Sequence, residues 1–424
     1  MVLSEVLIIY QEKETGEIMG SIRSLKCREC SKEYDPQFRY VCEDCFGPLD
    51  VTYKELSISR HTFELREKTY WRYFELLPIA DKSNVVSLNA GLTPLQHADK
   101  LGDKLGLKRL YIKNDSVNPT FSFKDRPAGV AVSRAKEIKL NAVGCASTGN
   151  LAAATAAHAA KAGMSCYIFA PSDIEHVKIA QALSYGGEFV AVEGTYDDAN
   201  RIASIIGDKK GIGVVNINMR PYYVEGSKTL AYEVAEQMDW QVPDSLIIPV
   251  GSGAMLNAIC KGFEELHSLG LIDSPKNMKL FAAQPRGCAP IVDAFKRSSD
   301  EVVPVEQPET IAKSLAIGDP GDGNYVLKRL KQYKGFAEEA SDQEIVDGIM
   351  LLAQTEGIFT EPAGGVSVAV LRKMAEEGKI DKDEHIVCYV TGNGLKATEA
   401  IIGLLPKLKA IKPDAAEVSA MMRG

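Results

Sequence analysis

A regular alternation of short apolar segments with helix-forming stretches runs from residue 110 to residue 390, and it constrains the fold more than any other feature. The apolar segments have the length of strands and are rich in β-branched residues, whereas the stretches between them have the length and period of helices. Strands that are apolar throughout and alternate with helices indicate parallel sheets covered by helices on both faces. The sequence therefore predicts an α/β fold. We expect strands at residues 110–113, 142–146, 165–170, 189–192, 213–218, 246–250, 279–283 and 385–390, and helices at 126–138, 149–162, 176–185, 196–206 and 227–238.

Capping signals and composition shifts indicate where elements and domains begin. Thr195 is expected to cap the helix that follows it, and Ser341 with Glu344 forms the pattern of a capping box. The first twenty residues and residues 406–424 have no clear period and suggest a poorly ordered arm and a tail. We expect an N-terminal arm with a Cys-rich segment at 1–55, a large domain at 56–140 and 221–405, and a small domain at 141–220.

The composition excludes several classes of partner. With 45% hydrophobic and 25% charged residues, the chain of 424 residues reads as an ordinary globular protein. A net charge of −8 does not favour nucleic acid, and no apolar run approaches the length of a membrane span. A secretory signal is not expected. Five cysteines are scattered singly among apolar residues, which is typical of free thiols in the cytoplasm: Cys145, Cys166, Cys260, Cys288 and Cys388.

Lys124 is the first candidate for chemistry. Pro119 breaks the chain before it, and Phe121 and Phe123 flank it. Apolar surroundings disfavour the charged form of an amine, and the neutral amine is the form that makes Schiff bases. The alternative is an ordinary surface lysine.

Two loops between a strand and a helix are candidate anion sites. Residues 147–150, Ser-Thr-Gly-Asn, precede a helix whose N–H groups favour anions, although the same residue types suit a capped turn. Residues 250–254, Val-Gly-Ser-Gly-Ala, let backbone N–H groups close on a phosphate but lack the Gly-Lys-Ser/Thr ending of a P-loop. Residues 392–397 fit the dinucleotide pattern G-x-G-x-x-A, but no second strand with an acidic residue follows, so we do not expect NAD.

Four cysteines form two C-x-x-C pairs, Cys27 with Cys30 and Cys42 with Cys45. Two such pairs are the ligand pattern of a structural zinc ribbon, although the separation is shorter than usual. The alternative is four free thiols.

These motifs, in this order, resemble the pyridoxal phosphate enzymes of the tryptophan-synthase-β fold type (fold type II), and most closely the threonine synthase family. The resemblance rests on residues 118–126, 146–150, 249–254 and 390–396, and residues 42–50 and 216–228 look like family members with an N-terminal cysteine segment. It implies two domains, each with a largely parallel sheet, and an N-terminal Cys-rich extension. It also implies a homodimer.

The resemblance further implies a role for individual residues. Lys124 would carry pyridoxal phosphate as a Schiff base, Asn150 would bind its phenolic oxygen, and Thr391 would face its pyridine nitrogen. The cofactor phosphate would lie at Gly251, Ser252, Gly253, Ala254 and Met255, and the substrate carboxylate at Ser147 and Thr148. Arg220 would bind the substrate phosphate, or else is a surface charge, with Lys113, Arg126 and Lys228 as further candidates.

The expected reaction converts O-phospho-L-homoserine and water into L-threonine and phosphate. A β-replacement synthase acting on O-phosphoserine, such as a cysteate or cysteine synthase, would share every motif, and a dehydratase is a more distant alternative. A zinc-ribbon binding protein on an inactive scaffold is the alternative of another class. The expected partner is a small amino-acid phosphate, with no nucleic acid and no membrane.

Overall fold

The computed structural model of the protein describes residues 21–147, 149–172 and 176–403, and isolated positions beyond residue 403. The expected N-terminal arm, most of the expected C-terminal tail and Thr148 lie outside the described residues. No described helix is long and apolar enough to cross a membrane.

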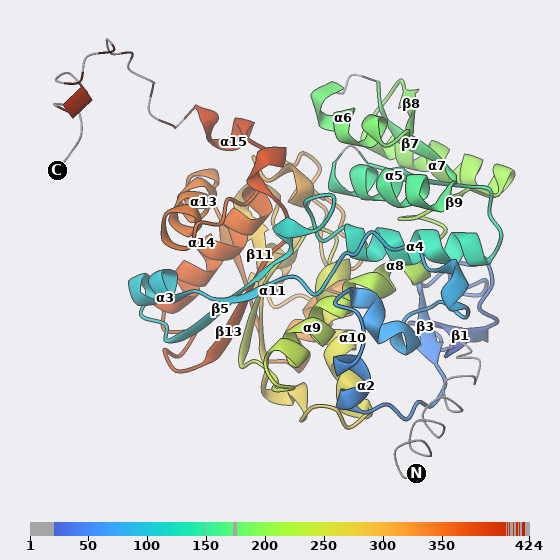
Figure 1. The fold of residues 1–424 in the computed structure, drawn as a ribbon, viewed down its shortest axis with the longest axis horizontal. Helices are drawn as coiled ribbons and strands as arrows, with labels where there is room; N and C mark the ends of the chain where they lie inside the picture. The colour runs from blue at the N-terminus through green and yellow to red at the C-terminus, as the bar shows by residue number, and fades with distance from the viewer. Residues whose placement is uncertain are drawn as a thin grey trace, which may run out of the picture.

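A six-stranded sheet forms the centre of the larger part of the molecule (Figure 1). Its strand order is β12-β11-β10-β13-β5-β4, and all neighbours are parallel except β4 and β5. The bounds are β4 (Leu95–His97), β5 (Arg109–Asn114), β10 (Ser245–Pro249), β11 (Lys279–Pro285), β12 (Phe336–Ala340) and β13 (His385–Val390). The predicted strands at 110–113, 246–250, 279–283 and 385–390 are therefore confirmed within a residue or two at each end.

Both faces of this sheet are covered, which explains its continuous apolar strands. Leu246 and Ile248 of β10 pack in one core with the helices α9 and α10, whereas Ile247 between them packs in a second core with α13 and α14. Alternate side chains of a strand point to opposite faces, so every position must be apolar when both faces are buried. The helices in this part are α2 (Arg60–Glu64), α3 (Asp99–Leu105), α4 (Asp125–Glu137), α8 (Arg220–Ser227), α9 (Thr229–Gln237), α10 (Ala254–Ser268), α11 (Pro290–Lys296), α12 (Gly323–Gln332), α13 (Asp342–Glu356), α14 (Pro362–Glu376) and α15 (Glu399–Ile402).

A four-stranded parallel sheet, in the order β8-β7-β6-β9, forms a second, smaller layer at the upper right of Figure 1. Its strands are β6 (Ala142–Ala146), β7 (Ser165–Pro171), β8 (Glu188–Val192) and β9 (Gly213–Val214), with α5 (Asn150–Ala162), α6 (His176–Ser184) and α7 (Tyr196–Lys210) between them. Thr195 and Asp198 form a capping box at the start of α7, as Ser341 and Glu344 do at α13. The small sheet lies within 141–220, and we keep the domain boundaries as a proposal.

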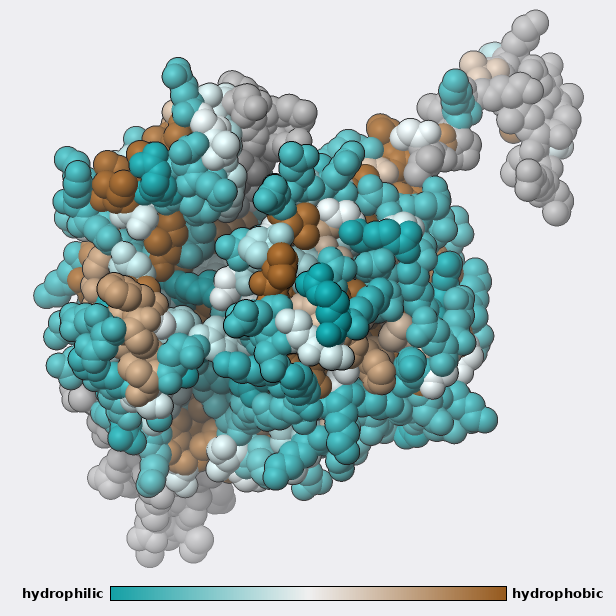
Figure 2. All heavy atoms as spheres, turned by 180° about the vertical axis from the view of Figure 1, so that it is seen from behind, coloured by the Kyte–Doolittle hydropathy of each residue, from teal (hydrophilic) through white to brown (hydrophobic). Residues whose placement is uncertain are grey.

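A third sheet lies at the N-terminal end of the described chain. It is antiparallel, in the order β2-β1-β3, and its strands are β1 (Ile22–Cys27), β2 (Glu33–Tyr34) and β3 (Leu49–Tyr53). It lies beside α8 (Figure 1), and β3 contacts that helix. On the face seen from behind, the surface is mostly hydrophilic and its apolar residues form separate small patches (Figure 2).

Two predicted elements are wrong in extent. The strand expected at 213–218 ends at Val214, because the Asn218 side chain accepts the Val214 N–H at 2.7 Å and closes a turn. The helix expected at 196–206 continues to Lys210. The helix expected at 227–238 is confirmed within two residues as α9, and a separate helix that was not predicted, α8, starts earlier, at Arg220. Pro221 in the first turn of α8 favours this earlier start.

Candidate functional site

Lys124 lies at the N-cap of α4, at the end of a loop that is held from two sides. The Phe123 N–H donates to the Thr391 carbonyl at 2.9 Å, and the Asn393 N–H donates to the Phe121 carbonyl at 3.0 Å. Phe121 adopts a left-handed conformation with φ of 65°, which is costly for a bulky side chain and is maintained only by surrounding contacts. The loop that ends at Lys124 thus lies against the backbone of Thr391 and Asn393, and the cofactor roles of Lys124 and Thr391 stay predictions.

The Lys124 amine donates to the Tyr223 hydroxyl at 3.1 Å and lies 4.6 Å from the centre of the Phe123 ring. Tyr223 comes from α8, so the lysine loop and α8 meet at this amine. No carboxylate forms an ion pair with Lys124 among the described residues. A half-buried amine between aromatic rings, with a neutral hydroxyl as its partner, suits a nucleophile better than a structural ion pair.

Glu361 holds the side chain of Asn150, a predicted cofactor ligand, through hydrogen bonds. The Asn150 side-chain amide donates to both Glu361 carboxylate oxygens at 2.9 and 3.0 Å, and the Glu361 N–H donates to the Gly392 carbonyl at 3.0 Å. Burial raises the pKa of Glu361, although the Asn150 amide and the charges of Lys396 and Lys124 oppose this shift. A Cβ on Gly392 would lie 2.4 Å from a Glu361 oxygen, so a larger residue there would displace the Glu361 carboxylate.

The glycine loop joins β10 to α10. Gly253 has φ of 92° and faces Val326 and Asp322, which would clash with a side chain. The first N–H groups of α10 have no intrahelical acceptor, so the helix start can receive an anion. The Met255 side chain is buried in the core, which leaves its backbone N–H for such a role.

Ser147 follows β6 and is half-buried, and its hydroxyl accepts the Gly149 N–H at 3.3 Å. The Asn216 side chain forms two hydrogen bonds with the backbone of Ala146, the residue before Ser147. It accepts the Ala146 N–H at 3.2 Å and donates to the Ala146 carbonyl at 3.3 Å. This contact positions the loop at the start of α5. Thr148, its expected partner, lies outside the described residues.

Arg220 begins α8, three residues before Tyr223, so both side chains lie on one face of that helix. One Arg220 nitrogen donates to the Asp322 carboxylate, whose side chain is 1% exposed. The Arg220 side chain is 30% exposed, and within the described chain its remaining nitrogens have no acceptor. The predicted phosphate ligand is thus held at one nitrogen and free at the others.

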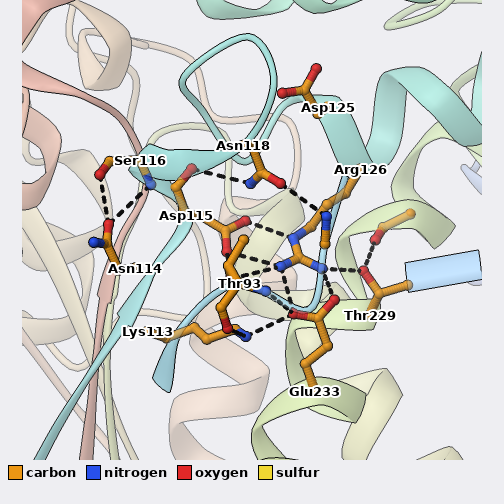
Figure 3. Close-up of polar contacts among 12 residues, drawn as sticks. Thr93, Lys113, Asn114, Asp115, Ser116, Asn118, Asp125, Arg126, Thr229 and Glu233 are labelled. Atoms are coloured by element: carbon orange, nitrogen blue, oxygen red, sulfur yellow. Dashed lines mark hydrogen bonds and ion pairs between the residues drawn. The ribbon is translucent and has the colours of Figure 1, made fainter. Parts of the chain in front are cut away.

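The further candidates for the substrate phosphate are buried in ion pairs. Arg126 binds Asp115 and Glu233, and Lys113 binds Glu233 at 2.7 Å, with both cations fully buried (Figure 3). Burial alone would raise the pKa of Glu233, but the two cations outweigh it and lower this pKa to about 2. Lys228 is equally buried and binds Glu225 and Glu265. None of the three offers a free charge to a ligand.

Asp125, next to Lys124, turns away to cap its own loop. It accepts the Thr120 N–H at 2.7 Å and the Thr120 hydroxyl at 2.9 Å. Burial raises the pKa of Asp125 to about 6, and it lowers the pKa of the neighbouring His158 to about 4. His158 Nδ1 contacts the Ala154 carbonyl within its own helix, so this histidine packs in the core.

The four cysteines form one cluster at the start of the chain. All four Sγ atoms lie within 4.8 Å of one another, and the Cys27–Cys45 and Cys30–Cys42 separations are both 3.5 Å. Thiolates about 2.3 Å from a tetrahedral zinc ion lie about 3.8 Å apart, so the cluster fits zinc with little adjustment. The Tyr34 hydroxyl, 3.0 Å from Cys42 Sγ, lowers the pKa of that thiol to about 6.

The two C-x-x-C turns have the same backbone geometry. The Ser31 N–H donates to the Cys27 carbonyl at 3.1 Å, and the Phe46 N–H donates to the Cys42 carbonyl at 3.0 Å. Ser31 and Phe46 both have left-handed φ, 61° and 57°, although neither is glycine. Strain repeated in two matching turns indicates a common constraint on the four thiols.

Three residues of the site escaped prediction from the sequence. Tyr223 is the second residue of a Tyr-Tyr pair, and its i,i+3 spacing from Arg220 is a signal in the sequence that could have indicated it. Glu361 and Asp322 are brought to the site from distant segments, and no local pattern marks them.

Comparisons with known proteins identify the family of the chain. Residues 86–392 match the family described as pyridoxal-phosphate dependent enzyme. The chain is 43% identical over 383 residues to the threonine synthase of Methanocaldococcus jannaschii, covering 89% of this chain and 94% of that protein. It is 40% identical over 382 residues to the threonine synthase of Methanosarcina acetivorans, covering 89% and 93%.

The fold is also similar to solved structures. The processed form of threonine deaminase isoform 2 from Solanum lycopersicum matches with a TM-score of 0.63 at 24% identity, covering 74% of this chain and 84% of that one. At this identity the similarity concerns the fold alone. The matched family region contains Lys124, Asn150 and Thr391, whereas the cysteine cluster precedes it.

Proposed function

The chain belongs to the pyridoxal-phosphate dependent enzymes and, within them, to the threonine synthases, and from this premise we propose how its site works. The reaction is the conversion of O-phospho-L-homoserine and water into L-threonine and phosphate. The observation that carries the proposal is the Lys124 amine, held by Tyr223 on the same helix face as Arg220. This relates a proton-transfer group, through one helix turn, to a guanidinium whose remaining nitrogens suit a phosphate.

The residues present fit pyridoxal phosphate. Lys124 would hold its aldehyde carbon and Asn150 its phenolic oxygen, and the N–H groups from Gly251 to Met255 would hold its phosphate. Thr391 offers the pyridine nitrogen a neutral hydroxyl, which leaves that nitrogen largely unprotonated. When bound, the cofactor supplies an electron sink that makes protons on the substrate Cα and Cβ acidic.

The side chains then divide the remaining work. Ser147 and Thr148 bind the substrate carboxylate, and Arg220 binds the phosphate at the other end of the substrate. The Lys124 amine takes the Cα proton and then a Cβ proton, and phosphate leaves from Cγ. The protons are given back to Cγ, which becomes the methyl group, and finally to Cα. Tyr223 fixes the amine for these transfers. Water adds at Cβ afterwards, so the site must exclude bulk water until phosphate has left.

The experiment is a comparison of two substrates on the purified holoenzyme. Phosphate release is measured with O-phospho-L-homoserine and with O-phospho-L-serine, and the amino-acid product is identified. We expect threonine from the first and little turnover of the second. Consumption of phosphoserine with sulfite or sulfide, and none of phosphohomoserine, would replace the proposal with a β-replacement synthase.

Two variants test the roles of single residues. Lys124→Ala should abolish turnover, whereas Lys161→Ala, at an exposed lysine of α5, should keep it. Arg220→Ala should lower kcat/KM for phosphohomoserine by roughly ten- to a hundredfold, because a charged hydrogen bond contributes about 1.5–3 kcal/mol. Near-normal turnover by Lys124→Ala would refute the assignment of the lysine.

We also propose that Cys27, Cys30, Cys42 and Cys45 hold one structural zinc ion. The distances among the thiols and the two matched turns support this. The absence of a histidine or carboxylate from the cluster leaves no open catalytic position. Metal analysis of the purified protein should give about one zinc per chain, and a metal-free, equally stable protein would leave only free thiols.

Two properties of the whole protein remain part of the proposal. We infer that the enzyme is a homodimer, which sedimentation velocity would test. None of the nine cysteines forms a disulfide, which supports our inference of a reducing compartment, the cytoplasm.

A further inference from the structure

Arg28 lies between two cysteines of the cluster, and every part of its guanidinium is engaged. Nε and Nη2 donate to the two Asp50 oxygens at 2.8 and 2.7 Å, and Nη1 donates to Asp322 Oδ1 at 2.9 Å. The guanidinium also lies over the Tyr325 ring, 4.9 Å from its centre. Such a planar, bidentate arrangement fixes the position of Arg28 more closely than a single contact would.

Asp322 connects this arginine to the functional site. Its Oδ1 accepts from Arg28, its Oδ2 accepts from Arg220, and its N–H donates to the Ser252 carbonyl at 3.0 Å. Asp322 is 1% exposed, so water screens these contacts little. One buried carboxylate therefore joins the cysteine cluster to both the predicted substrate arginine and the predicted cofactor-phosphate loop.

The charges in this bridge alternate along Asp50, Arg28, Asp322 and Arg220. Arg28 and Arg220 share the two oxygens of Asp322, so neither arginine is neutralised by it alone. Without Arg28, the full charge of Asp322 would face Arg220. The positive potential that Arg220 offers to an anion would then fall.

The cysteine cluster fixes the backbone position of Arg28. The Arg28 N–H donates to the Pro48 carbonyl at 3.0 Å, and the turn that contains Arg28 closes through the Cys27 carbonyl. Arg28 lies in this turn between Cys27 and Cys30, and the Sγ atoms of these two cysteines lie within 4.8 Å of those of Cys42 and Cys45. A metal held by the four thiols would fix the turn, and its loss would free the turn and with it Arg28.

We propose that Arg28 is a positioning residue for substrate binding, and that the affinity of the site for a phosphate group depends on the integrity of the cysteine cluster. The proposal rests on the proposed function in one respect, the binding of the substrate phosphate by Arg220. It assigns to the N-terminal segment a role in substrate affinity beyond stability. The effect should fall on KM and leave kcat largely intact, because Arg28 touches no reacting atom.

The first test uses Arg28→Ala, Arg28→Lys and, as a matched control, Arg23→Ala, whose arginine is exposed on the same segment. Inorganic phosphate binding to the holoenzyme is measured by titration calorimetry, and kcat and KM are measured with O-phospho-L-homoserine. Arg28→Ala should raise the phosphate Kd and KM roughly tenfold, within the range for coupled charged neighbours, and change kcat less than about twofold. Arg28→Lys should restore part of the affinity, and Arg23→Ala should match wild type.

The second test perturbs the cluster itself. Cys30→Ser, or removal of the metal with a chelator, should raise the phosphate Kd as Arg28→Ala does, and added zinc should reverse the chelation. The double variant Arg28→Ala with Cys30→Ser should bind phosphate no more weakly than the single variants, since both act through one bridge. If Cys30→Ser does not fold, the Arg28 series decides alone.

The outcomes separate this proposal from the proposed function. If Arg220→Ala weakens phosphate binding but Arg28→Ala leaves the phosphate Kd and KM unchanged, the bridge has no role and the enzyme assignment stands. If Arg220→Ala also binds phosphate like wild type, Arg220 is not the phosphate ligand and this proposal fails with that assignment. A fall in kcat with unchanged KM in Arg28→Ala would equally overturn it.

Discussion

Replacing Arg126 with methionine should be among the most destabilising single changes in this chain. Arg126 is fully buried two residues after Lys124 and donates to Asp115 at 2.6 and 2.9 Å and to Glu233 at 2.8 Å (Figure 3). Methionine fills a similar volume but leaves two buried carboxylates with Lys113 as their one remaining cation in this cluster. Breaking a buried ion pair from one side costs about 3–5 kcal/mol, and two carboxylates place the expected loss at the upper end.

The loss should depend on pH in a defined direction. In wild type the folded-state pKa of Glu233 is lowered to about 2, below its unfolded value, so its stabilising contribution is present above about pH 4 and is lost as pH falls toward 2. Without Arg126, burial opposes the charged form of Glu233 with one cation fewer, and the pKa of Glu233 in the folded state rises. The variant therefore loses stability as pH rises, and its deficit should be larger at pH 7 than at pH 4.

Urea denaturation at pH 7 and pH 4, followed by circular dichroism, measures both deficits. Arg126→Lys keeps one charge and should lose less than Arg126→Met. Arg201→Met is the matched control, because Arg201 is 62% exposed in its pair with Asp198 and such pairs contribute about 0–1 kcal/mol. Equal deficits for Arg126→Met at both pH values, or a loss no larger than that of Arg201→Met, would refute the reasoning.

Three further changes test other parts of the site. Glu361→Ala should lower kcat/KM roughly tenfold while Glu361→Gln retains more activity, because glutamine can still accept from Asn150; equal losses measured in steady-state assays would argue against that contact. The folded-state pKa of Asp125, about 6, exceeds its unfolded value, so wild type should lose about 3 kcal/mol of stability as pH rises from about 4 to 6. Asp125→Asn should abolish this pH-dependent loss. Unchanged pH dependence of the variant in urea titrations would contradict this. Chelation of the cysteine cluster should lower the melting temperature measured by scanning calorimetry while kcat persists, and an unchanged melting temperature would leave the thiols without a structural metal.

The fold could be predicted from the sequence where a local rule decides. The strand at 385–390 and the capping boxes at Thr195 and Ser341 follow from apolar runs and from hydrogen bonds within four residues. The strand at 213–218 failed because Asn218 folds back on Val214, a side-chain contact that outweighs β-propensity. Local patterns describe the backbone well until a polar side chain competes for it.

The site could be predicted less completely, for a similar reason. Lys124, Asn150 and the glycine loop lie in motifs that are contiguous in sequence. Glu361 and Asp322 reach the site across long separations, and a buried carboxylate has no sequence pattern of its own. Arg126 was considered as a phosphate ligand because its type and position suit one, and only the packing of Asp115 and Glu233 around it excludes that role.

The helix α8 explains how these separate parts act together. Tyr223 from this helix holds the Lys124 amine, and Arg220, one turn earlier, meets Asp322 and through it Arg28 of the cysteine cluster. A cofactor bound at Lys124 and a substrate phosphate bound at Arg220 would be held at a fixed separation, because Tyr223 and Arg220 are three residues apart on this helix and helix geometry sets that spacing. Fixing Arg220 from the cluster then restricts where the substrate phosphate binds, which links the N-terminal segment to substrate affinity while the amine keeps its own partner, Tyr223.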